Sequence, residues 1–196
     1  TIWGTSSSWT LTALPLFVWM GEILFRTRLS ENLFKGLSPW MQKLPGGLIH
    51  VNVVGCALFA AISGSSAATV ATVGKMSIPE LRKRNYPEKI LLGSLAGSGT
   101  LGLLIPPSII LIIYGVAVQE SIAKLFIAGI LPGIMIALIF MSYVIFWSLI
   151  NKKQMPKIVE EYSIFEKIKR SKQLLPVIFL ISAVIGSIYT GIATAT

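Results

Sequence analysis

The sequence contains one cysteine, one histidine and only eight acidic residues among 196. A lone cysteine, Cys56, cannot form an intrachain disulfide, and its apolar neighbours favour a small packed hydrophobic residue. The sequence has no His/Cys set with metal-ligand spacing, no Gly-x-Ser-x-Gly motif and no paired carboxylates in an apolar segment. These absences argue against an intramembrane enzyme, and we predict neither catalytic residues nor a cofactor.

Apolar residues are abundant: 54% of the sequence is hydrophobic and only 13% is charged. This composition is typical of a polytopic membrane protein, and the fold class that we expect is all-α. The formal net charge of +9 comes from 17 basic residues, most of which cluster in three segments between apolar runs. The positive-inside rule and anionic headgroups explain that pattern, so we expect a lipid bilayer and no nucleic acid as partner.

The most informative stretch runs from Gly46 to Gly74. Its middle reads Ser63-Gly64-Ser65-Ser66-Ala67-Ala68-Thr69, and apolar runs and then basic segments flank it on both sides. Basic flanks favour the cytoplasmic side, and about 42 Å of helix is enough for one membrane crossing but not for two. We therefore predict a re-entrant helical hairpin over 46–74, with its tip at membrane depth and surrounded by protein or water.

Two interpretations of this tip stay open. Gly, Ala and Ser favour close helix contacts in membranes, which would make the tip a packing element. Carbonyl and hydroxyl oxygens are equally suited to hold an alkali cation, and the helix that follows the tip directs its positive end at any bound anion.

A second irregular stretch lies between Ile90 and Val118. Four glycines and three hydroxyl residues precede the pair Pro106-Pro107. Adjacent prolines remove two amide donors and disfavour helix at Ile105, so the carbonyls just before them lose their helical partners. We predict a transmembrane helix that is broken near mid-membrane, as in transporters whose unwound carbonyls bind a cation; a simple kink is the alternative.

The remaining segments follow from the same pattern. Glu22 precedes Arg26 by four residues, which suits an ion pair on a helix. Leu29 to Leu44 places apolar residues on one helical face, which predicts an amphipathic helix that lies in the membrane plane or packs against a partner helix. The complete division is a transmembrane helix at 1–28, the amphipathic helix at 29–45, the hairpin at 46–74, a cytoplasmic loop and broken helix at 75–118, a transmembrane helix at 119–150, a basic cytoplasmic loop at 151–172 and a last transmembrane helix at 173–196.

These motifs resemble the large membrane (M) subunit of TRAP transporters, of the DctM-like form. The resemblance rests on Leu44-Pro45-Gly46-Gly47, His50-Val51-Asn52-Val53, the tip motif at 63–69, the stretch from Gly99 to Ser108, and the stretch from Ser121 to Gly129. It covers nearly the whole chain. The last residues, 191–196, resemble the start of a further family segment, so we expect the sequence to be an internal portion of a longer protein.

The resemblance implies an inverted-repeat, elevator-type transporter of the bacterial inner membrane, in which sodium drives uptake of a C4-dicarboxylate or sugar acid. Its partners would be a small membrane (Q) subunit and a periplasmic substrate-binding (P) protein. The family's first sodium site uses backbone carbonyls of the hairpin tip and the broken helix, and carried over by motif these are the carbonyls of Ser63, Ser65, Gly102, Ile105 and Pro107. The family's site for the substrate carboxylate falls on Ser65, Ser66, Thr69, Pro106 and Ser108.

Two other functions compete with this one. A divalent-anion/sodium symporter works without a binding protein, and dependence of uptake on such a protein separates it from a TRAP importer. A purely structural membrane subunit would need neither a polar hairpin tip nor a broken helix.

Overall fold

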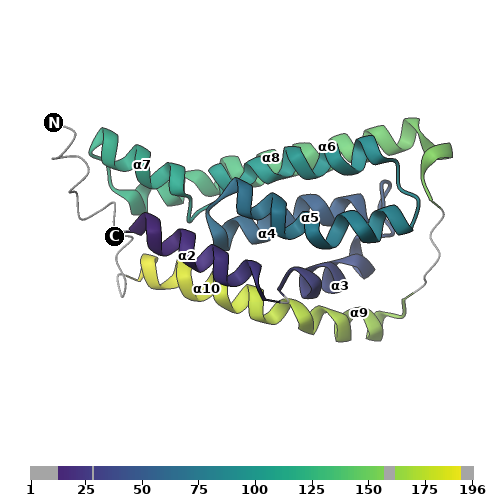
Figure 1. Cartoon of the computed structure of the whole chain (residues 1–196), viewed down its shortest axis with the longest axis horizontal. Coiled ribbons are helices and arrows are strands. Elements are labelled where there is room, and N and C mark those ends of the chain that lie inside the picture. The colour runs from purple at the N-terminus through teal and green to yellow at the C-terminus, as the bar shows by residue number, and fades with distance from the viewer. Residues whose placement is uncertain (1–12, 28, 157–161, 191–196) are drawn as a thin grey trace.

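The computed structural model describes residues 13–27, 29–156 and 162–190, and these ranges are helical without a strand (Figure 1). The all-α prediction is thus confirmed for them; residues 1–12, Arg28 and the family-like end at 191–196 lie outside them. The elements are α2 (Ala13–Phe25), α3 (Leu29–Met41), α4 (Ile49–Ser63), α5 (Ser66–Lys83), α6 (Glu88–Gly99), η2 (Thr100–Leu103), α7 (Ile109–Val118), α8 (Ile122–Ile150), η3 (Lys152–Gln154), α9 (Ile164–Ser171), η4 (Lys172–Leu174) and α10 (Leu175–Tyr189).

Helices α4 and α5 form a hairpin in the middle of an elongated bundle (Figure 1). α4 is buried by neighbouring segments on nearly every side, and side chains such as Phe59 and Ile62 have no exposed surface. A helix in such a position is apolar around its whole circumference, as α4 nearly is. It ends at Gly64, whose φ of 61° lies in the left-handed region that favours glycine. Ser65 is extended, and the Ala68 N–H donates to its Oγ (3.4 Å), which caps α5. The sequence therefore forms a helical hairpin here, whereas its re-entry into a membrane stays a prediction.

The second arm of the hairpin is longer than its predicted bounds. We expect a loop from residue 75 onward, but α5 continues to Lys83 and only residues 84–87 separate it from α6. This extension is amphipathic: Ser77 and Leu81 are buried, whereas Arg82 and Lys83 are exposed. Its charges suggest a loop, but Leu81 packs into a core cluster with residues of α3, α4 and α6, and this burial stabilises helix.

The chain between Gly99 and Ile109 is not α-helical. After α6, η2 forms one 3₁₀ turn, and residues 104–108 are non-helical before α7 begins. Ser108 then caps α7: its Oγ donates to the Leu103 carbonyl (2.7 Å) and accepts from the Leu111 N–H (3.5 Å). The predicted interruption is therefore present, and it is a connector of residues 104–108 and not a kink.

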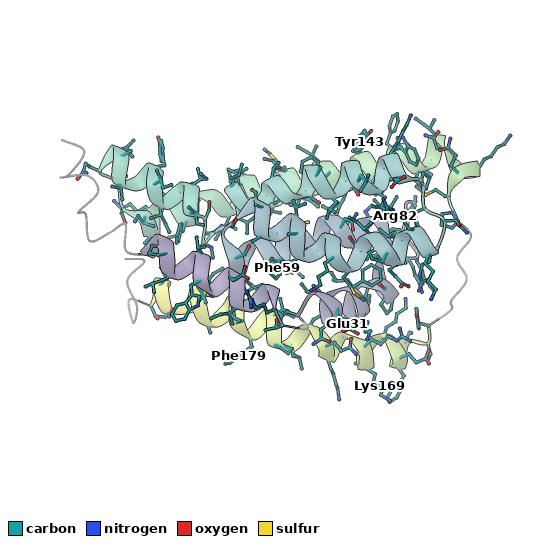
Figure 2. The ribbon with its side chains drawn as sticks, in the orientation of Figure 1. Glu31, Phe59, Arg82, Tyr143, Lys169 and Phe179 are labelled. Carbon is teal, nitrogen blue, oxygen red and sulfur yellow. The ribbon has the colours of Figure 1, made fainter. Side chains whose placement is uncertain are left out.

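Two helical segments, 122–150 (α8) and 164–188, are long and apolar enough to cross a membrane. α8 has a large exposed apolar face, on which Leu131 is 76% exposed and Phe146 is 65% exposed. Figure 2 shows many such side chains projecting outward along the bundle. A surface of this kind contacts lipid or another protein segment.

The predicted amphipathic helix is α3, and its apolar face, including Leu33 and Leu37, is buried. Pro39 lies inside α3 without breaking it. At the end of α3, the Trp40 Nε1–H donates to Ser171 Oγ at the end of α9 (2.8 Å). The two helices therefore lie side by side, as Figure 1 also shows.

The predicted basic loop at 151–172 is partly helical. α9 starts with a capping box, in which the Ser163 N–H donates to Glu166 Oε2 (3.1 Å). Ser-x-x-Glu is a sequence signal for a helix start, and the high charge of the segment obscured it. α9, η4 and α10 then follow one another directly.

Tyr86 closes the base of the hairpin, in the turn between α5 and α6. The Leu48 N–H donates to its Oη (3.0 Å), and burial raises the pKa of the Tyr86 phenol above its usual value. A raised folded-state pKa stabilises the protein below the unfolded pKa of 10.0, and this contribution is lost as the pH rises through the folded-state pKa.

We expect Tyr86→Phe to lower the free energy of unfolding by about 1 kcal/mol at neutral pH, because the Leu48 amide loses its acceptor. It should also reduce the loss of stability above about pH 10. Thermal unfolding at neutral and at alkaline pH measures both effects. Tyr114→Phe, an exposed tyrosine, is the control; an equal alkaline loss in Tyr86→Phe and in the wild type would contradict the assignment.

Candidate functional site

The hairpin tip meets the broken helix inside the bundle. The N–H of Ile109, the first residue of α7, donates to the Gly64 carbonyl (3.2 Å). A Cβ placed on Gly64 would lie only 2.6 Å from the Pro107 carbonyl oxygen, so this approach requires a residue without a side chain. The tip motif and the double-proline motif, which are far apart in the sequence, therefore form one site.

η2 packs against the same tip through Gly102. A Cβ on Gly102 would lie 2.9 Å from Ser66 N and 3.0 Å from the Ser65 carbonyl carbon. The backbone of η2 thus runs directly along the backbone at the start of α5. Backbone peptide groups of η2 and of the start of α5 therefore lie at the same narrow interface between these two segments.

α8 supports the connector through two glycines that sequence reasoning did not identify as contact residues. A Cβ on Gly129 would lie 2.7 Å from the Leu104 carbonyl oxygen, and one on Gly133 would lie 2.8 Å from Ile105 Cγ1. The two glycines form a Gly-x-x-x-Gly motif, which is typical of close approach between membrane helices. That motif is the signal that could have revealed them.

The predicted hydroxyl groups have different partners. Ser63 Oγ and Thr69 Oγ1 share a hydrogen bond of 3.0 Å across the tip, and both side chains are buried. The hydroxyls of Ser65 and Ser108 cap helices. Ser66 Oγ is buried and has no hydrogen-bond partner within the described residues. An unsatisfied buried hydroxyl costs about 1–3 kcal/mol, so Ser66 is the hydroxyl best placed to gain a bond from a ligand.

The structure brings several of the predicted site residues together. Ser63, Ser65, Gly102 and Pro107 lie at the tip and its two contact points. Ile105, which is predicted to contribute its backbone carbonyl, lies in the connector two residues before Pro107, and its side chain packs on Gly133 of α8. Pro106 is buried in the connector between them. The assignment of these residues to sodium or substrate stays a prediction.

Four helix ends meet at this interface. α4 and η2 end here, while α5 and α7 begin here. Helix N-termini carry a partial positive charge and C-termini a partial negative charge. The described residues contain no group of three or more His, Cys, Asp or Glu side chains that could hold a metal ion. The interface therefore offers backbone dipoles of both signs in place of ionised side chains.

These features, apolar helices on the surface and an interface of helix ends inside, are typical of a helical membrane protein. A family model described as "Tripartite ATP-independent periplasmic transporter, DctM component" matches residues 1–196. The chain belongs to this family, and the resemblance of its motifs to the large TRAP membrane subunit is confirmed.

Similar proteins come from several bacteria. The chain is 36% identical to the C4-dicarboxylate TRAP transporter large permease protein DctM of Pseudomonas aeruginosa, over 98% of this chain and 44% of that protein. It is 33% identical to the sialic acid TRAP transporter large permease protein SiaM of Vibrio cholerae, with the same coverage of 98% and 44%. It is 34% identical to the isethionate TRAP transporter permease protein DctMQ of Oleidesulfovibrio alaskensis, over 96% of this chain and 29% of that protein. The chain thus spans less than half the length of these relatives.

Proposed function

We propose that the chain is part of the transport subunit of a sodium-coupled, binding-protein-dependent importer of small organic acids, embedded as a multi-pass protein in a bacterial inner membrane. The observation that carries the proposal is the meeting of the tip and the connector, where helix ends of both signs face one interface. Carbonyl ends suit a cation and amide ends suit a carboxylate. A symporter of sodium and an organic anion needs both.

The dimensions of the helices support a re-entrant hairpin. α4 has 15 residues, which gives about 22 Å, less than the hydrocarbon thickness of roughly 30 Å. α8 has 29 residues, which gives about 44 Å and is enough to cross. The connector packs on Gly129 and Gly133, which lie in the first half of α8. A crossing α8 would therefore hold the tip and the break at membrane depth.

We also propose an order of binding that uses the same contacts. Sodium bound by carbonyls of the tip and of η2 would fix the spacing of these two segments, and the amide ends of α5 and α7 would then receive the carboxylate. Coupling arises because each ligand prefers the interface that the other has ordered. In an elevator mechanism the hairpin and the broken helix would move as one body, with the amphipathic helix α3 as a brace between moving and fixed parts.

Substrate and partners are proposed from the family. The relatives named above carry C4-dicarboxylate, sialic acid and isethionate in their names. We propose a small organic anion of this kind, delivered by a periplasmic binding protein, and a small membrane subunit beside the permease. The alternative, a divalent-anion/sodium symporter, would transport without the binding protein.

The test uses the full-length permease with its small subunit in proteoliposomes. The cognate binding protein is first screened by thermal shift with succinate, N-acetylneuraminic acid and isethionate as probes. Uptake is then measured with the compound that raises the unfolding temperature of the binding protein. This uptake should require both an inward sodium gradient and the binding protein. Equal uptake in potassium would overturn sodium coupling, and equal uptake without the binding protein would favour the alternative.

We expect Ser65→Trp to abolish sodium-dependent uptake while the permease still folds, because the indole would fill the interface between the tip and η2. Folding is checked by size-exclusion chromatography and thermal unfolding. Ser121→Trp is the matched control, since Ser121 is exposed and makes no side-chain cap hydrogen bond. Undiminished uptake by Ser65→Trp would show that transport does not use this interface.

A further inference from the structure

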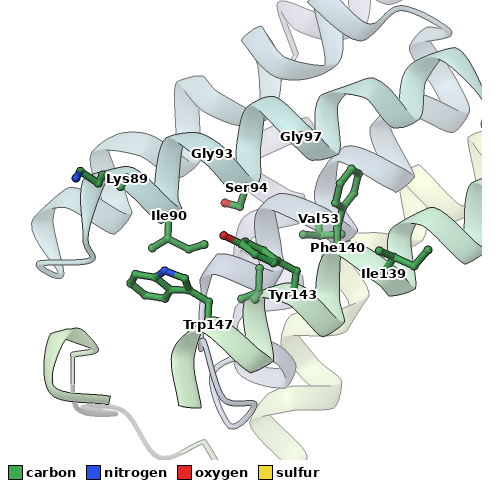
Figure 3. A pocket seen from close by; sticks show the side chains of 11 residues that line it. Val53, Lys89, Ile90, Gly93, Ser94, Gly97, Ile139, Phe140, Tyr143 and Trp147 are labelled. Atoms are coloured by element: carbon green, nitrogen blue, oxygen red, sulfur yellow. The ribbon is translucent and has the colours of Figure 1, made fainter. Parts of the chain in front are cut away.

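A groove of about 610 Å³ lies between α6 and α8, away from the tip interface (Figure 3). Its floor on α6 is formed by Gly93 and Gly97. A Cβ on Gly93 would meet no atom within 4 Å, so this glycine serves no helix contact in the described chain. Glycines in membrane helices normally allow close helix packing; Gly93 instead leaves an open slot.

The groove changes chemically along its length. Figure 3 shows Lys89 and Trp147 at one end and Ile139 and Phe140 at the other. Glu88, beside Lys89, is paired with Arg82, whereas the Lys89 ammonium forms no ion pair within the part of the chain that the structure describes. Trp and Lys at a helix end are typical of the membrane–water boundary, and the other end is suited to hydrocarbon.

The size of the groove limits what can fill it. One turn of helix about 10 Å across and 5.4 Å long occupies roughly 420 Å³, so the groove holds less than two turns. It lies within the range of small-ligand sites. A thin apolar chain with an anionic group at one end matches its shape, its apolar lining and its single cation.

We propose that the groove binds one acyl chain of an anionic phospholipid from the cytoplasmic leaflet, with the lipid phosphate at Lys89. The acyl chain lies along Gly93 and Gly97, and Trp147 lies at the level of the glycerol backbone. Basic pockets between membrane helices on the cytoplasmic side bind lipid headgroups in this way. The site is separate from the proposed sodium and substrate interface.

The experiment uses the full-length permease, purified in detergent and delipidated, with phosphatidylglycerol that carries a photoreactive diazirine in its acyl chain. Peptide mapping by mass spectrometry should place the label on α6 and α8 at the groove. Gly93→Phe should remove the label, whereas Gly186→Phe should keep it, because a Cβ on Gly186 also meets nothing within 4 Å but lies on α10. Label that maps elsewhere, or that survives Gly93→Phe, would overturn the proposal.

A second comparison leaves the shape of the groove intact. Lys89→Gln should weaken phosphatidylglycerol binding about fivefold, and the exposed Lys153→Gln should not change it. Diacylglycerol with the same photoreactive chain should label the wild type less than phosphatidylglycerol does. Equal labelling by the two lipids would exclude the phosphate contact. A cross-link from Gly93→Cys to another segment of the permease would show that protein, and not lipid, covers the groove.

Discussion

Replacing Gly64 by alanine should abolish transport and lower the free energy of unfolding by about 2–4 kcal/mol. Two costs add at this position. The φ of 61° is unfavourable for a residue with a side chain, and the new methyl group would lie 2.6 Å from the Pro107 carbonyl oxygen. Neither backbone segment yields easily, because the Ile109 N–H bond holds the tip against the start of α7. Sodium-dependent uptake and thermal unfolding of the full-length permease measure the two effects.

The matched control is Gly55→Ala, inside α4, the helix that Gly64 caps. A Cβ there would lie 3.6 Å from Val73 Cγ1, an ordinary contact, and alanine favours helix over glycine by up to about 1 kcal/mol. Gly55→Ala should therefore be as stable as the wild type or more stable. If Gly64→Ala transports as well as Gly55→Ala does, the close approach of tip and connector is not needed for function.

Gly102→Ala is expected to act on sodium affinity more than on folding. Its Cβ would press on Ser66 N and on the Ser65 carbonyl carbon at 2.9 and 3.0 Å, which separates η2 from the tip where we propose that sodium binds. A contact this short costs about 1–3 kcal/mol. If that cost opposes ion binding, the sodium concentration for half-maximal uptake rises roughly five- to 150-fold.

Sodium should also raise the unfolding temperature of the wild type relative to potassium, because a ligand of the native state stabilises it. Gly102→Ala should lose most of this difference, and Gly55→Ala should keep it. An unchanged sodium dependence in Gly102→Ala, in both uptake and unfolding, would place the ion somewhere else.

The irregular places in the fold could be predicted because they depend on local chemistry. Small polar residues between two apolar runs predict the turn at Gly64 and Ser65, and paired prolines predict the connector that ends at Ser108. Both occur where they are expected. The helical extension to Lys83 could not be predicted from charge, because Leu81 stabilises it through a core formed with other helices.

The sequence motifs identify residues that lie close together in the structure, but they do not predict the detailed contacts between them. The motifs point to Ser63, Ser65 and Gly102, which the structure brings to one interface. The packing of Ile105 on α8, and the glycines that receive the connector, depend on contacts between distant segments. The only sequence signal of these contacts that we identify is the spacing of Gly129 and Gly133.

The uninterrupted course of α5 has a mechanical consequence. From Ser66 to Lys83 it is one helix of 18 residues, or about 27 Å, with the capped tip at one end and two basic side chains at the other. Pro79 lies inside this helix without ending it. If the helix moves as one body, a shift of the tip on ion binding would also displace the charged end. The position of the charged end at the aqueous surface would then depend on whether the buried interface is empty or occupied.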